Sequence, residues 1–147
     1  MSWLSGKEIE DAIHKYADAP TRAAFAGVYS IDKLPFAVPH YPFFIIVNTQ
    51  AHNLPGAHWI TIFIDKNHRG EIFDSLALPP QQIVMRWIHQ FARSVTRNRL
   101  MFQHPLSDTC GAFALYFVFH RLKGPVTFTK TIHVNENVVR TFYYDMK

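Results

Sequence analysis

The chain has one cysteine among its 147 residues, at position 110. One cysteine excludes an intramolecular disulfide and gives no sign of an oxidising compartment, so we expect an intracellular, reducing location. It also argues against zinc, because zinc sites draw on several cysteines or on histidines paired with carboxylates at helical spacing, and the nine histidines lack that pairing. We therefore expect no metal and no other cofactor.

Long apolar runs are also lacking. The longest candidate, residues 111–119, falls short of the roughly 18–20 residues that cross a bilayer. The first eight residues have neither the basic start nor the apolar core of a signal peptide. With no repeat and no linker, and 48% hydrophobic residues, the sequence predicts a single domain over 1–147 that is monomeric and makes no membrane contact.

Positive charge is in modest excess, with a net charge of +4 and a pI of about 9.3. Part of it clusters at Arg86, Arg93, Arg97 and Arg99. Such a cluster suits DNA or an acidic partner. The helical spacing of Arg86 and Arg93 equally fits a solvated helix face, so both interpretations stay open.

The apolar pattern predicts a helix, a run of strands, and then helices with one further strand. Ser5 and Glu8 form a capping box for a helix over 5–17. A short strand is expected over 28–30. The later elements follow: strands over 41–49, 58–65 and 71–76, a helix over 79–96, a strand over 99–103, and helices over 110–122 and 134–144. This order predicts an α+β fold with a mostly antiparallel central sheet flanked by helices.

Cys110 opens the predicted central helix. Unpaired N–H groups and the helix dipole at a helix N-terminus favour a thiolate, which is the reactive form of cysteine. Taken alone, a cysteine in an aromatic helix is more often a buried apolar residue. Its significance depends on what lies beside it.

His58 and Asp74 lie at the two open ends of the predicted hairpin around residues 66–70. Counting outward from the turn leaves them offset by roughly three residues, or about 10 Å, a gap that strand twist or a bulge can close. If they meet, the carboxylate fixes the imidazole tautomer and leaves the other ring nitrogen for the thiol. Gln103, seven residues before Cys110, can donate its amide N–H to an oxyanion. Each residue also has an ordinary structural interpretation, but their combination in this order favours a thiol protease.

Three sequence blocks together resemble the adenovirus maturation protease (adenain) family, which belongs to the same superfamily, clan CE, as the SUMO-specific and deneddylating proteases. They are Gly56-Ala57-His58-Trp59, residues 71–76 (EIFDSL) and residues 103–113 (QHPLSDTCGAF). Their order and spacing are similar to those of the family, and the compatible secondary structure covers nearly the whole chain. The seven-residue step from Gln103 to Cys110 resembles the viral type more than the SUMO-protease type.

By position, the resemblance implies Cys110 as nucleophile, His58 as general base and then acid, Asp74 as orienting acid and Gln103 as oxyanion donor. It implies that Trp59 packs near the cleavage site and helps to form a narrow channel suited to glycine. The implied function is a viral or mobile-element maturation endopeptidase that cuts structural precursors beside glycine. A viral enzyme of this kind would work in the host nucleus or the virion.

Two features depart from the adenovirus pattern. Human adenovirus enzymes commonly carry Glu where this chain has Asp74, as SUMO proteases do. The adenovirus enzyme also holds an activating peptide through a second cysteine, which this chain lacks, so an activating peptide would bind noncovalently, and DNA is a further candidate activator. Two alternatives stay open: a protease that removes ubiquitin-like modifiers, and an idle domain that binds nucleic acid or protein through its basic face.

Overall fold

A five-stranded mixed sheet forms the centre of the computed structural model, which describes residues 4–38, 40–50 and 58–147. The strands lie side by side in chain order, with antiparallel pairing of β2 with β3 and of β3 with β4 and parallel pairing at both edges. Their bounds are β1 Phe25–Ser30, β2 Phe43–Asn48, β3 Trp59–Ile64, β4 Arg69–Phe73 and β5 Ser94–Arg97.

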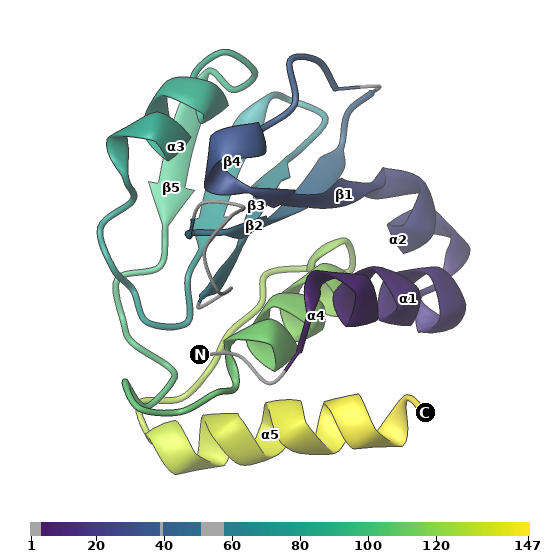
Figure 1. Cartoon of the computed structure of the whole chain (residues 1–147), viewed down its shortest axis with the longest axis vertical. Coiled ribbons are helices and arrows are strands. Elements are labelled where there is room, and N and C mark those ends of the chain that lie inside the picture. Colours follow the sequence, from purple (N-terminus) through teal and green to yellow (C-terminus); the bar gives the residue numbers. More distant parts are fainter. Residues whose placement is uncertain (1–3, 39, 51–57) are drawn as a thin grey trace.

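Helices cover both faces of this sheet (Figure 1). They are α1 Gly6–Tyr16, α2 Ala19–Ala24, α3 Gln82–Ile88, α4 Cys110–Arg121 and α5 Ile132–Asp145, with a short 3₁₀ turn at Ile31–Lys33. One face carries α1 and α4, with α5 packed on α4, while α3 lies on the opposite face. None of the helices in the described ranges is both long and apolar enough to cross a bilayer.

Strand β2 shows why the sheet is buried on both sides. Phe43, Ile45 and Val47 pack into the cluster beneath α3, whereas Phe44 and Ile46 pack into the cluster beneath α4. Alternate side chains of a strand point to opposite faces, so a continuous apolar run fits only a doubly covered strand. The strand predicted over 41–49 is confirmed in this position.

The terminal helices and the central helix follow their sequence signals. Ser5 caps α1 by accepting from the Glu8 N–H at 3.1 Å, and the Glu8 carboxylate accepts from the Ser5 N–H at 3.0 Å. Helix α4 begins at Cys110, as predicted, and α5 spans the helix expected over 134–144. The loop expected over 50–56 lies, apart from residue 50, outside the described residues.

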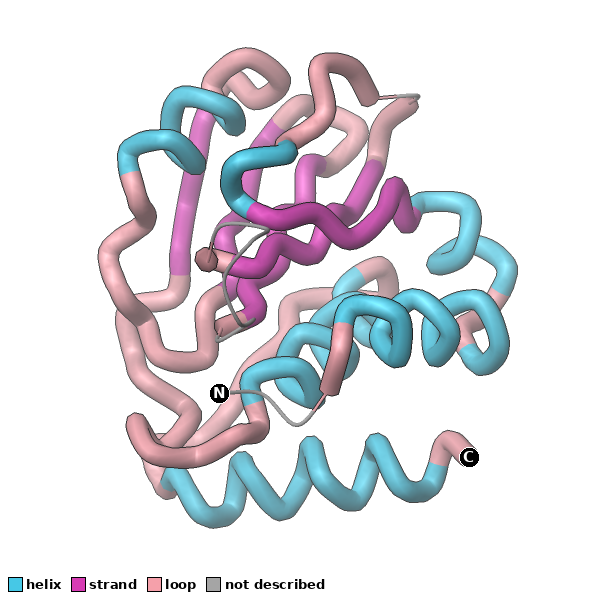
Figure 2. Tube along the Cα trace, in the orientation of Figure 1, coloured by secondary structure: helices cyan, strands magenta, loops and turns pink. Residues whose placement is uncertain are grey.

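The second half of the sheet differs from the prediction. The predicted α+β fold is confirmed, and its sheet is mixed: β2–β3 and β3–β4 pair antiparallel, whereas β1 and β5 each pair in parallel with their neighbour. The helix expected to reach residue 96 ends at Ile88, and the strand expected over 99–103 is replaced by β5 at Ser94–Arg97 followed by loop (Figure 2). A helix between β4 and β5 returns the chain to the same end of the sheet, which makes the pair parallel.

Candidate active site

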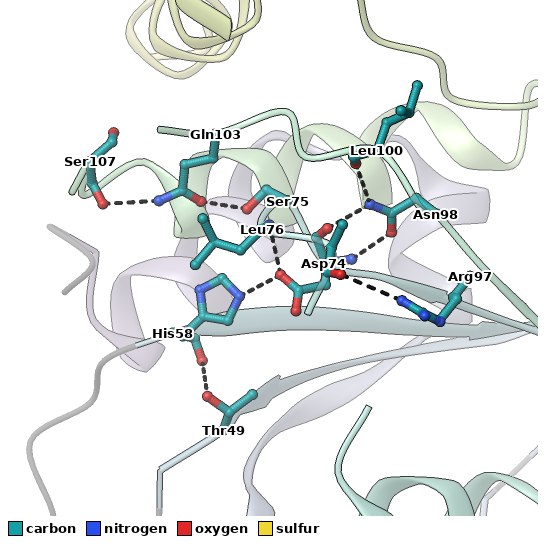
Figure 3. Close-up of polar contacts among 11 residues, drawn as sticks. Thr49, His58, Asp74, Ser75, Leu76, Arg97, Asn98, Leu100, Gln103 and Ser107 are labelled. Carbon is teal, nitrogen blue, oxygen red and sulfur yellow. Dashed lines mark hydrogen bonds and ion pairs between the residues drawn. The ribbon is translucent and has the colours of Figure 1, made fainter. Parts of the chain in front are cut away.

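The β3–β4 hairpin brings His58 and Asp74 together. The register pairs Thr61 with Phe73, so its continuation sets Asp74 beside Ile60, two residues from His58 rather than the three expected. The side chains close the remaining gap: His58 Nε2 lies 2.6 Å from Asp74 Oδ1 (Figure 3). Both residues are buried, so water competes little for this bond. The predicted contact between them is present in the structure.

Asp74 is held in place by its own turn and by Asn98. The Asn98 side chain contacts both sides of the Asp74 backbone: its Oδ1 accepts from the Asp74 N–H at 2.9 Å, and its Nδ2 donates to the Asp74 carbonyl at 2.6 Å. Asp74 Oδ1 also accepts from the Leu76 N–H at 2.8 Å. The carboxylate therefore faces His58 from a fixed backbone (Figure 3).

The surroundings of His58 favour its protonated form. Burial alone would lower the pKa of the imidazole, but hydrogen bonds to Asp74 and then to Cys110, with the negative charges of both, raise the pKa to about 9. His58 is therefore an imidazolium at neutral pH. A cation beside the thiol favours the thiolate.

Cys110 is the first residue of α4, where the sequence predicted it. The first intrahelical bond runs from the Phe113 N–H to the Thr109 carbonyl at 3.0 Å, so the preceding N–H groups, including that of Cys110, lie before the helical ladder. The cysteine is only 1% exposed. A substrate carbonyl can therefore reach the sulfur only through a narrow approach or after neighbouring groups move aside.

Gln103 is equally buried, and its side-chain amide is held at both ends. Its Oε1 accepts from Ser75 Oγ at 2.5 Å, and its Nε2 donates to the Ser107 carbonyl at 2.9 Å. A primary amide nitrogen carries two hydrogens, so the Ser107 bond uses one and the second can serve an oxyanion.

Trp59, expected beside the cleavage site, is the first residue of β3. Its ring is buried, and its Nε1–H donates to the Leu4 carbonyl at 3.0 Å, which ties the start of the chain to β3. A role for Trp59 in a substrate channel stays a prediction. The neighbouring Gly56 and Ala57 of the same sequence block lie outside the described residues.

Sequence reasoning missed three residues that support the site: Ser75, Asn98 and Glu136. Glu136 of α5 accepts from the His104 N–H at 3.0 Å and from Thr109 Oγ1 at 3.2 Å, which braces the loop before Cys110. Only the position of Ser75, directly after Asp74, carried a signal in the sequence. The other two depend on contacts between residues more than 20 positions apart.

The thiol of Cys110 is expected to ionise well below the ordinary cysteine pKa of about 8.5. Ultraviolet thiolate absorbance reports this directly, because the chain has a single cysteine, and Cys110→Ala provides the blank. The His58 cation persists to about pH 9, so its effect on the thiolate holds throughout the neutral range and is lost as the pH rises through that value. In His58→Ala the thiol titration should move up toward 8.5; identical titrations in the two proteins would contradict the pairing.

Comparison with known proteins gives one curated relative and a group of structural neighbours. No protein-family model matches the chain. The chain is 28% identical over 109 residues to cysteine protease S273R of African swine fever virus (isolate Tick/Malawi/Lil 20-1/1983), a match that covers 64% of this chain and 38% of that protein. The chain thus spans less than half the length of its curated relative.

The crystal structure of the ASFV pS273R protease matches with a TM-score of 0.65 at 19% identity, over 95% of this chain and 66% of that chain. The chain therefore shares the fold of that cysteine protease. The SUMO protease Ulp1 matches more weakly, with a TM-score of 0.41 over 71% of this chain and 53% of that chain. The resemblance to a viral cysteine protease is supported by the S273R matches, whereas the adenovirus type in particular stays a prediction.

Proposed function

We propose that this chain is a cysteine protease in which Cys110 is the nucleophile, His58 its proton-transfer partner and Asp74 the orienting acid. The observation that carries the proposal is the 2.6 Å bond from His58 Nε2 to Asp74, with the cysteine hydrogen-bonded to the same ring at the start of α4. The sequence similarity to S273R supports the same reaction class.

The chemistry follows from the charges of the paired residues. The Cys110 thiolate attacks the scissile carbonyl carbon, and the carbonyl π electrons move to oxygen. The resulting oxyanion accepts from the Gln103 amide and from the Cys110 backbone N–H. His58 then protonates the leaving amine, which departs and leaves a thioester on Cys110. In the second half, His58 takes a proton from water, the hydroxide attacks the thioester, and the thiolate and the new carboxylic acid are released.

Glycine beside the scissile bond suits this site. The sulfur of a cysteine that is 1% exposed is approached most easily by a backbone segment without side chains. We therefore propose substrates with glycine before or flanking the cut, as the sequence resemblance implied. Processing of viral or mobile-element structural precursors is the role in which such a protease would act.

Peptide hydrolysis tests the proposal. Fluorogenic peptides ending in Leu-X-Gly-Gly and Leu-X-Gly-X, and a folded ubiquitin-like protein fused through its diglycine tail, would be offered to the wild type and to Cys110→Ala. We expect cysteine-dependent cleavage of the short peptides while the folded fusion is ignored.

Other outcomes divide the alternatives. A preference for the folded fusion would move the protein to the modifier-removing class. Each assay is repeated with double-stranded DNA, because the net charge of +4 is compatible with DNA activation. Absence of cleavage under all these conditions, together with an ordinary thiol pKa, would favour the idle binding domain.

A further inference from the structure

We infer that Ser75 is a positioning residue that sets the orientation of the Gln103 amide; this inference rests on the proposed protease function. Ser75 follows Asp74 directly, so one turn after β4 supplies both the acid for His58 and the hydroxyl for Gln103. Neither the sequence prediction nor the reaction steps above assigned a role to this serine.

Ser75 contacts Gln103 through both its main chain and its side chain. The Ser75 carbonyl accepts from the N–H of Phe102 at 2.8 Å and from that of Gln103 at 3.1 Å. The Ser75 hydroxyl donates to Gln103 Oε1 at 2.5 Å. The backbone bonds hold the Gln103 main chain beside the turn. The hydroxyl fixes the end of its side chain (Figure 3).

The two ends of the amide are distinguished chemically. The Ser107 carbonyl can only accept, so it selects the Nε2 end, while the Ser75 hydroxyl donates to the oxygen end. A flipped amide would set Oε1 against the Ser107 carbonyl, which is repulsive, and would move the N–H groups to the Ser75 end. The bond from Ser75 also polarises the amide, which strengthens the remaining N–H as a donor.

Burial makes this arrangement sensitive to the loss of one hydroxyl. Ser75 and Gln103 are each 1% exposed, so water cannot readily replace the hydroxyl. Without it, Oε1 lacks this donor, and of the two bonds only that from Nε2 to the Ser107 carbonyl remains, so the amide is held less firmly. The oxyanion then meets a correctly oriented donor for only part of the time.

The test compares Ser75→Ala in two backgrounds, the wild type and Gln103→Ala, with the fluorogenic glycine peptides as substrates. In the wild-type background we expect kcat to fall about 10-fold with little change in KM, less than the loss of about 10²–10³ for removing an oxyanion donor outright. In the Gln103→Ala background the same change should alter kcat by less than about twofold, because Ser75 then has no amide to orient.

Two controls separate positioning from general damage. Ser94→Ala removes an exposed serine of β5 and should leave kcat unchanged. The thiolate titration of Ser75→Ala should match that of the wild type, because the hydroxyl acts on Gln103 and not on the His58 pair. Thermal unfolding confirms that the variants are folded.

The outcomes distinguish this inference from the function on which it rests. An unchanged kcat in Ser75→Ala, an equal loss in both backgrounds, or a shifted thiolate titration would overturn the positioning role while leaving the protease intact. A wild type without Cys110-dependent hydrolysis would overturn both.

Discussion

Replacement of His58 by alanine is expected to lower kcat by on the order of 10⁶, about as much as replacement of Cys110 itself. The reason is that the two residues act as one unit. Without the imidazolium the thiol loses the cation that favours its ionised form, and the leaving amine loses its proton donor. The few remaining turnovers would come from substrate binding and the oxyanion donors.

The decisive measurement compares the kcat loss of the double variant with the losses of the two single variants. We expect the double variant Cys110→Ala/His58→Ala to be no slower than either single variant, measured as kcat on the same glycine peptides. His133→Ala is the matched control, because His133 is an exposed histidine on α5. A kcat loss in the double variant equal to the product of the two single losses would mean that His58 and Cys110 do not work together. Equal losses in the His58 and His133 variants would mean the same.

Asp74→Asn is expected to reduce kcat by about 10⁴, by analogy with the same exchange in serine-protease triads. The amide keeps the size of the side chain but removes the negative charge, which is among the causes that raise the pKa of His58. The pKa of His58 should therefore fall, and the thiol titration should move to higher pH.

Comparison with Asp74→Glu sharpens this prediction. Glutamate restores the negative charge one methylene further from the backbone, so the kcat loss of Asp74→Glu should be smaller than that of Asp74→Asn. Asp11→Asn provides the control for removing a carboxylate elsewhere, since Asp11 lies exposed on α1. If Asp74→Asn kept the wild-type rate and thiol titration, the carboxylate would be only a turn-capping group for Leu76.

The parts of the fold that the sequence predicted well are those with strong local signals. The Ser5–Glu8 capping box and the buried run of β2 depend on neighbouring residues. The predicted end of the helix over 79–96 was wrong because apolar residues four apart continue past Ile88, where α3 ends. Val95 continues this spacing, but its segment, Ser94–Arg97, pairs with β4 as strand β5. That pairing overrides the helical pattern.

The candidate site likewise depends partly on local sequence signals and partly on long-range contacts. The sequence by itself predicted the candidate site residues, because a cysteine opening a helix, a hairpin with histidine and aspartate at its ends, and a glutamine before the cysteine are all readable in order along the chain. Only the tertiary structure decided that His58 Nε2 and Asp74 Oδ1 are 2.6 Å apart, that Asn98 bonds the Asp74 backbone, and that Ser75 bonds the Gln103 amide. The physical reason is that hydrogen-bond geometry between segments 16 to 28 positions apart depends on strand register and loop paths, which local sequence patterns do not encode.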